Sequence, residues 1–155
     1  MNVNVHQSEI DNAGQGLFVN NNYTFRKGEI MCVYEGELVA HDVATAPGYN
    51  SDYMIEVLDN EWVIDAKNTE SFAKYANDPI EKKKYNAYLI ANDNLTVVLV
   101  ANKKIGPGKE IYVPYDENFW HNWDHYDALS QDHKWALYER GSAPFRAWVE
   151  ENYMN

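Results

Sequence analysis

The chain has 155 residues, the size of a single domain with a substantial hydrophobic core. Hydrophobic residues make up 45% and aromatic residues 14% of it, a composition that argues against extensive disorder. The formal net charge is −11, from 13 basic and 24 acidic residues, so the chain repels nucleic-acid phosphates and attracts basic peptides. We therefore expect no direct nucleic-acid binding. A basic partner is one interpretation of the charge, and simple solubility is the other.

Cysteine and histidine usage limits the chemistry further. Cys32 is the sole cysteine, which excludes an intrachain disulfide and a cysteine-built zinc site and favours a reducing compartment. His121 and His125 are four residues apart, but they flank a stretch that reads as a loop rather than a metal site. No segment has a membrane-spanning apolar length, and residues 1–6 lack a secretion signal. We expect an intracellular protein, nuclear or cytoplasmic, that binds no metal and no membrane.

The first hundred residues carry short apolar runs separated by glycine, asparagine and aspartate, which is the pattern of a mainly β protein. The predicted strands are residues 3–6, 17–19, 30–34, 37–39, 53–57, 62–65, 86–91 and 95–101. The predicted turns and loops are Gly14-Gln15-Gly16, Lys27-Gly28, residues 40–50, the hairpin connections at 58–61 and 93–94, and the lysine-rich residues 81–84.

Helical patterns are sparse until the C-terminal part of the chain. A short helical turn is predicted at residues 71–75 and is ended by Asn77-Asp78-Pro79, because a residue before proline is pushed away from the helical region. Residues 127–139 and 142–153 are predicted helices, the second capped by Ser142. Its shared apolar face is Phe145, Trp148, Val149 and Tyr153.

Residues 106–115, Gly-Pro-Gly-Lys-Glu-Ile-Tyr-Val-Pro-Tyr, read as a glycine turn followed by a short strand. The strand must end at Pro114, because proline donates no ladder hydrogen bond. Tyr115 then stands on a rigid neighbour, from which its hydroxyl can point into a cleft. Taken alone, however, the pattern favours an ordinary half-buried aromatic residue with a solvated hydroxyl.

Five motifs in a characteristic order change that interpretation. They are residues 12–19 (Asn-Ala-Gly-Gln-Gly-Leu-Phe-Val), residues 27–36 (with Lys-Gly-Glu-Ile and Tyr-Glu-Gly), Ile64-Asp65-Ala66, Tyr75-Ala76-Asn77-Asp78 and residues 108–115. Over residues 3–120 the chain resembles the SET-domain protein lysine methyltransferases. The resemblance implies a mainly β fold, the β-clip or SET fold, with several small sheets around a pseudoknot, short helices and a helical C-terminal segment. We expect residues 1–120 to be the catalytic domain and residues 121–155 a helical extension packed on the same domain.

The resemblance also implies a reaction and its residues. S-adenosylmethionine would be the methyl donor, giving S-adenosylhomocysteine, and a lysine of a basic protein tail, such as a histone tail, would be the acceptor. Tyr115 would be the principal catalytic tyrosine, with Tyr34 as its partner in the lysine channel. Val113, two residues before Tyr115, would help to set the number of methyl groups added, and Tyr88 is a further candidate hydroxyl in the channel.

The residues implied to bind the cofactor are Gly14, Gly16, Leu17, Tyr53, Asn77, Asp78 and Trp120. Glycine allows the backbone to approach a ligand closely, an asparagine amide offers donors and an acceptor, and Trp120 would cover the adenine. A plain turn at the glycines and core packing of Tyr53 and Trp120 are the structural alternatives. For methyl transfer the lysine must be neutral, although the pKa of free lysine is about 10.4. A channel of low polarity and tyrosine hydroxyls that add no charge would favour the neutral amine.

Two features depart from the family pattern. Asp78 stands where a histidine commonly follows Asn77, and Asn86 comes later than usual because of the insertion at residues 81–84. The cysteine-rich zinc segment that follows the domain in the family is also absent, so residues 121–153 must complete the site or form a separate extension. A catalytically inactive SET-like interaction module is therefore the competing hypothesis. A carbohydrate-binding β protein fits the composition but not the ordered motifs.

Overall fold

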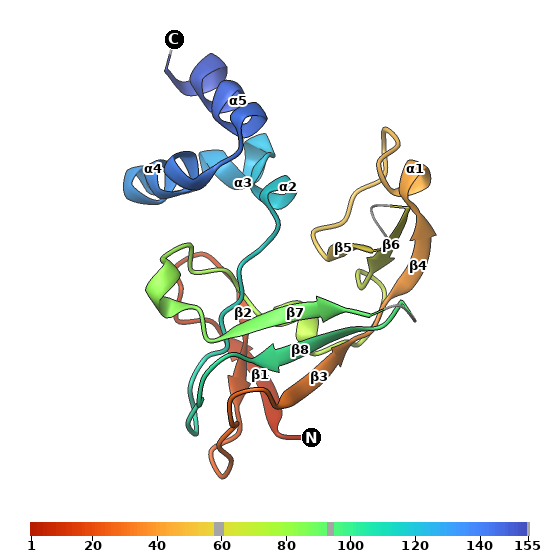
Figure 1. The fold of residues 1–155 in the computed structure, drawn as a ribbon, viewed down its shortest axis with the longest axis vertical. Coiled ribbons are helices and arrows are strands. Elements are labelled where there is room, and N and C mark those ends of the chain that lie inside the picture. The colour runs from red at the N-terminus through yellow and green to blue at the C-terminus, as the bar shows by residue number, and fades with distance from the viewer. Residues whose placement is uncertain (58–60, 93–94, 155) are drawn as a thin grey trace.

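The structure is a computed structural model that describes residues 1–57, 61–92 and 95–154. The strands are β1 (Val3–Gln7), β2 (Gln15–Val19), β3 (Ile30–Tyr34), β4 (Glu37–Ala40), β5 (Met54–Val57), β6 (Trp62–Asp65), β7 (Ala87–Ala91) and β8 (Val97–Ala101). The helices are α1 (His41–Ala44), α2 (Glu117–Trp120), α3 (Trp123–Asp127), α4 (Gln131–Arg140) and α5 (Ala143–Tyr153), and 3₁₀ turns occur at Ala73–Tyr75 and Lys82–Lys84. The predicted mainly β fold with short helices and a helical C-terminal segment is confirmed (Figure 1).

The described strands form three small antiparallel sheets with the orders β1-β2, β3-β8-β7 and β4-β6-β5. The central strand β8 lies within the strand predicted at residues 95–101 and is rich in valine, and both its neighbours pair with it. Side chains on β2 and β8, such as Leu17 and Leu99, are completely buried in one shared core. Full burial of such a side chain contributes roughly 1.5–3 kcal/mol to stability. A second cluster, with Tyr34 of β3, Ile64 of β6 and Val97 of β8, joins the β4-β6-β5 sheet to the β3-β8-β7 sheet. The sheets are therefore held together by hydrophobic packing and not by a continuous hydrogen-bond ladder.

Several local predictions needed correction. Residues 40–50, predicted as a loop, contain the short helix α1. Gln15 and Gly16, predicted as part of a turn, already belong to β2. The helix expected at residues 127–139 begins only at Gln131, because Ser130 caps α4 by accepting a hydrogen bond from the backbone N–H of His133. The predicted hairpin connections at residues 58–60 and 93–94 lie outside the described residues.

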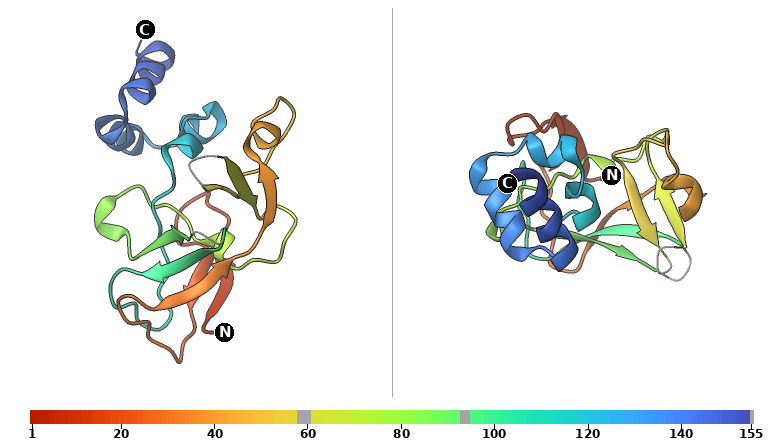
Figure 2. Two further views of the ribbon diagram at one scale, coloured as in Figure 1. Left: turned by 45° about the vertical axis from the view of Figure 1, so that its right-hand side comes forward. Right: turned by 90° about the horizontal axis from the view of Figure 1, so that it is seen from above.

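The C-terminal helices pack on the rest of the chain through an aromatic cluster. Phe145 and Val149 of α5 are buried in it together with Trp120 and Ile80. The predicted cap of α5 is confirmed, since the Ser142 side chain accepts from the backbone N–H of Phe145. Figure 2 shows these helices gathered on one side and the β4-β6-β5 sheet on the other. In the part of the chain that the structure describes, no helix has the length and apolar character needed to cross a bilayer.

Residues 106–115 do not form the regular strand that the sequence predicted. They make isolated bridges instead, pairing Glu110 with Phe18 and Tyr112 with Asn77. The carbonyl of Tyr112 also accepts from the backbone N–H groups at both Asn86 and Ala87, each at 3.2 Å. The segment is thus bonded to both ends of the loop at residues 77–87, which agrees with the threaded crossing implied by the resemblance. Proline at 114 then ends the pairing.

Asp65, at the end of β6, organises the loop that precedes β5. The carboxylate is buried and accepts hydrogen bonds from the hydroxyls of Tyr49 and Ser51, both at 2.6 Å, and from the backbone N–H of Lys67 at 2.9 Å. Burial acts to raise the pKa of Asp65, but these hydrogen bonds and the charge of Lys67 outweigh it and hold the pKa below its ordinary value.

This arrangement predicts an acid-sensitive contribution to stability. Because the folded-state pKa of Asp65 is lowered, its contribution is complete above the ordinary value of about 3.9 and is lost as the pH falls through the folded value. We expect Asp65→Asn to unfold at lower denaturant concentration at pH 7 and to lose less stability than the parent between pH 5 and 2. Urea unfolding across that range measures it, with the exposed Asp11→Asn as control. An equal acid-induced loss in parent and Asp65→Asn would contradict this role.

Candidate active site

The hydroxyl of Tyr115 is held by the segment that precedes Pro79. It donates to the backbone carbonyl of Ala76 at 2.8 Å and makes a longer contact of 3.3 Å with the side-chain oxygen of Asn77. The backbone N–H of Tyr115 donates to the carboxylate of Asp78 at 2.9 Å. Tyr115 is therefore fixed at its main chain and at the end of its side chain, and it is not the solvated aromatic residue that the local pattern alone favoured.

Two further tyrosines lie beside Tyr115. The hydroxyl of the buried Tyr34, on β3, donates to the backbone carbonyl of Tyr53 at 2.7 Å. Burial raises the pKa of Tyr115, and the charge of Asp78 and the neighbouring Tyr34 and Tyr53 raise it further. Burial likewise raises the pKa of Tyr34. Both hydroxyls are thus protonated and neutral at physiological pH, and both already donate to a backbone carbonyl.

The glycine segment is joined to these tyrosines by Asn77. The Asn77 amide donates to the backbone carbonyl of Gln15 at 2.8 Å, while its oxygen faces the Tyr115 hydroxyl. At Gly16 an added Cβ would come within 2.5 Å of a carboxylate oxygen of Glu110, so only glycine allows this close approach. Gly14 has a φ of 73° and nothing within 4 Å of an added Cβ, which leaves room beside its backbone.

Trp120 and Asp78 are bonded to each other. The indole N–H of Trp120 donates to Asp78 at 3.1 Å, and the indole stacks on the Tyr115 ring at 6.0 Å between centroids. Both residues are buried, at 8% and 6% exposed. The Asp78 carboxylate points into the protein, and Trp120 forms one wall against Tyr115. Their predicted contacts with a cofactor stay predictions.

Of the remaining predicted residues, two lie in the hydrophobic core and one lies on strand β7. Leu17 and Val113 are completely buried in the main core, so neither side chain is open to solvent. Tyr88 is on β7, where Leu89 faces the core that Tyr115 also packs against. Because side chains alternate across a strand, Tyr88 lies on the other face. The structure therefore does not bring Tyr88 and Tyr115 together.

Sequence reasoning missed the importance of Glu110. Its carboxylate is 3% exposed and accepts from the Ser8 hydroxyl at 2.6 Å and from the backbone N–H of Glu9 at 2.8 Å. The Asn86 side chain bonds to the same segment, accepting from the Tyr112 N–H at 2.8 Å and donating to the Glu110 carbonyl at 3.0 Å. The sequence signal that could have indicated this role is the acidic Glu110 inside a run that otherwise resembles a strand.

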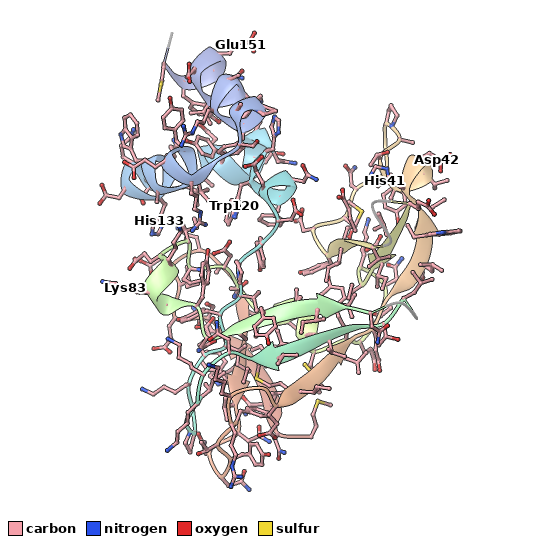
Figure 3. All side chains as sticks on the ribbon, viewed as in Figure 1. His41, Asp42, Lys83, Trp120, His133 and Glu151 are labelled. Carbon is pink, nitrogen blue, oxygen red and sulfur yellow. The ribbon has the colours of Figure 1, made fainter. Side chains whose placement is uncertain are left out.

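Polar contacts connect helices α2 and α3 with the loop and sheet opposite. His125 of α3 approaches Asp52 at 3.0 Å, and Asn118 of α2 approaches Glu56 of β5 at 3.3 Å. His41, on α1, lies 3.5 Å from the same Glu56. Figure 3 labels Trp120 and His41 on the two parts that these contacts join. The acidic side chains Asp52 and Glu56 give this boundary a negative character suited to a basic segment.

These groups fit S-adenosylmethionine. The backbone beside Gly14 is open, the Asn77 amide is partly exposed, and the nearby tyrosines are neutral. Gly14, Gly16, Asn77 and the wall formed by Trp120 are the residues that would hold it. Among the residues that the structure describes, no group of three or more His, Cys, Asp or Glu side chains is placed to bind a metal ion.

Comparisons with solved structures agree with this fold. A solved structure described as ctPRC2 in an autoinhibited conformation bound to S-adenosylmethionine matches with a TM-score of 0.63 at 24% identity, over 76% of this chain and 15% of that one. The methyltransferase domain of human PR domain-containing protein 2 matches with a TM-score of 0.56 at 21% identity, over 74% of this chain and 77% of that domain. At these identities the likeness shows the fold.

The sequence comparisons show the family. The sequence model of the SET domain matches residues 14–116, which is more than half of the chain. The chain therefore belongs to the SET-domain family. Among its relatives is histone-lysine N-methyltransferase CLF of Oryza sativa subsp. japonica, which is 29% identical over 110 residues. That match covers 68% of this chain and 12% of the rice protein, so the chain corresponds to a small part of its relative.

Proposed function

We propose that this chain is an S-adenosylmethionine-dependent protein-lysine N-methyltransferase that acts on a basic protein tail, such as a histone tail. The observation that carries the proposal is the commitment of the Tyr115 hydroxyl hydrogen to the Ala76 carbonyl at 2.8 Å. Because that hydrogen is used, the hydroxyl oxygen is left as an acceptor. The Tyr34 hydroxyl, bonded to the Tyr53 carbonyl, is in the same state.

Two accepting hydroxyls suit a neutral amine. They take its N–H hydrogens and so leave its lone pair directed away from the tyrosines. Their raised pKa values keep these two hydroxyls neutral, whereas a tyrosinate would favour the unreactive ammonium form. The buried Tyr34 and the aromatic wall of Trp120 limit the access of water. When bound, S-adenosylmethionine supplies a methyl group activated on a positively charged sulfur.

The predicted roles of the individual residues follow from this proposal. Tyr115 and Tyr34 orient the amine, and Gly14, Gly16, Leu17 through its backbone, Tyr53, Asn77, Asp78 and Trp120 form or support the cofactor site. Val113 remains the residue proposed to influence the number of methyl groups added, through its volume in the core behind Tyr115. Residues 1–120 would form the catalytic domain and residues 121–155 an extension packed on it. A nuclear or cytoplasmic location goes with this function.

The substrate class rests on charge. A net charge of −11 and the carboxylates of Asp52 and Glu56 beside the site attract a lysine-rich or arginine-rich segment. The relative from rice is named as a histone-lysine N-methyltransferase, which supports the same choice.

Cofactor binding and methyl transfer test the proposal separately. We expect calorimetry to detect S-adenosylmethionine binding, and labelled cofactor to transfer its methyl group to lysines of a histone panel or of proteins in a cell lysate, located by mass spectrometry. Addition of S-adenosylhomocysteine should suppress labelling. Absence of binding at high cofactor concentration would overturn the proposal and favour an interaction module without catalysis.

A further inference from the structure

Asp78 is a buried carboxylate with four hydrogen-bond donors. One oxygen accepts from the backbone N–H of Ile80 at 2.7 Å and from the hydroxyl of Tyr85 at 2.6 Å. The other accepts from the backbone N–H of Tyr115 at 2.9 Å and from the indole of Trp120 at 3.1 Å. A carboxylate that accepts this many hydrogen bonds is rigidly oriented. Through the second oxygen it controls where Tyr115 and Trp120 stand.

Arg140, in the last turn of α4, contacts both residues that donate to the first carboxylate oxygen of Asp78. Its guanidinium donates to the Tyr85 hydroxyl at 3.0 Å and to the Ile80 carbonyl at 2.8 Å. It also lies 5.8 Å from the centre of the Tyr85 ring. Arg140 therefore holds Ile80 and Tyr85, the two residues that donate to the first oxygen of Asp78. It also adds positive charge on the side of the network away from Tyr115.

We propose that Asp78 is a positioning residue for Tyr115 and that Tyr85 and Arg140 hold it in place. The proposal rests on the function proposed above. Tyr115 follows Pro114, which has no N–H, so the Tyr115 N–H is the donor by which this turn can be anchored. With the bond to Asp78 it is fixed at the main chain, and with Trp120 stacked on it at 6.0 Å it is fixed at the ring.

The network joins three features that depart from the family pattern. Asp78 replaces the common histidine, Tyr85 directly follows the lysine-rich insertion at residues 81–84, and Arg140 belongs to the C-terminal helices. Each member of this chain of hydrogen bonds thus lies in or directly beside one of these departures. The insertion and the C-terminal helices thereby contribute to the arrangement of the site, although neither supplies a group that faces the hydroxyl of Tyr115 or Tyr34.

Three variants of the full chain test this inference, namely Asp78→Asn, Tyr85→Phe and Arg140→Met. Two controls match them in chemistry. Tyr138→Phe removes a tyrosine hydroxyl bonded to a carboxylate, that of Glu150, and Arg146→Met removes an arginine that bonds backbone carbonyls and lies over a tyrosine ring. Both control residues lie in the C-terminal helices and are not bonded to Asp78, Tyr85 or Arg140.

The readouts are kcat and KM for a basic peptide, the Kd for S-adenosylmethionine, and the NMR resonances of the Tyr115 amide and Trp120 indole. We expect Asp78→Asn to lower kcat about 10-fold or more, as for a displaced reacting group. Tyr85→Phe and Arg140→Met should lower kcat less while KM changes little, and all three should shift both resonances. The controls should leave kcat and both resonances unchanged.

Kinetic losses no larger than in the controls, or losses confined to KM, would overturn the positioning role. Failure of the proposed function is distinguishable from this result. If the unaltered chain neither binds S-adenosylmethionine nor transfers methyl groups, the NMR arm still decides whether the network holds Tyr115. Resonances that stay in place in Tyr85→Phe and Arg140→Met would then overturn the inference, and shifts in both would support it.

Discussion

Tyr115→Phe is expected to lose most methyl transfer while it keeps the fold and the affinity for S-adenosylmethionine. In the parent chain the Tyr115 hydroxyl donates its hydrogen to the Ala76 carbonyl, so its oxygen is free to accept a hydrogen bond from the substrate amine. The substitution removes that oxygen. Loss of orientation at a reacting group costs about 10²-fold or more in rate. Because the lost contact acts on the amine, the fall should appear in kcat, with the calorimetric Kd for the cofactor little changed.

The control for this variant is Tyr126→Phe. Tyr126 is also buried, and its hydroxyl donates to a backbone carbonyl, that of Lys134, at 2.9 Å. Either substitution leaves a carbonyl without its donor and should cost about 1 kcal/mol of stability. Activity should fall in Tyr115→Phe alone. Normal turnover in that variant would remove the Tyr115 hydroxyl from the mechanism.

Gly36→Ala is expected to have the largest effect on stability. Gly36 lies between β3 and β4, where the chain passes from one sheet to another. It is exposed to solvent, yet an added Cβ would stand 2.7 Å from the backbone of Asp65 and from a methyl group of Ile64. Backbone of a paired strand cannot move aside cheaply, so we expect a loss of about 1–3 kcal/mol in the free energy of unfolding.

Gly106→Ala is the matched control, because an added Cβ there meets nothing within 4 Å and its φ is not positive. Its stability should stay within about 0.5 kcal/mol of the parent chain. Urea unfolding measures both variants. A Gly36→Ala protein as stable as Gly106→Ala would show that the two sheets can shift apart at this point without cost.

Strands and helix caps could be predicted because their causes are local. The valine-rich residues 97–101 form β8 as expected, and Ser142 caps α5 as its sequence indicated. The assignment of β3 and β4 to different sheets could not be predicted, since it depends on pairing with β8 and β6, far along the chain. The break before Gln131 was missed because a single serine cap outweighed a continuous helical pattern.

The candidate site could be predicted in part. The motifs indicated Tyr115, Tyr34 and Asn77, and the structure brings these close together. The inward orientation of Asp78 could not be predicted, because its donors, Ile80, Tyr85, Tyr115 and Trp120, come from separate segments that no spacing rule connects. The strand face on which Tyr88 lies could not be predicted for a simpler reason. To place Tyr88 in the lysine channel one must know which face of β7 its side chain lies on, and that face is set by the pairing of β7 with β8.

The contact between Ser8 and Glu110 spans 102 residues, and the one between Asn77 and Gln15 spans 62. Closing such long loops is entropically costly and makes folding slow, because the reward comes only after the distant segments meet. A chain still being synthesised has its glycine segment complete long before Glu110 exists. We therefore expect that ribosome-bound chains that end before residue 110 cannot bind S-adenosylmethionine, and that the cofactor site appears late and in a single step.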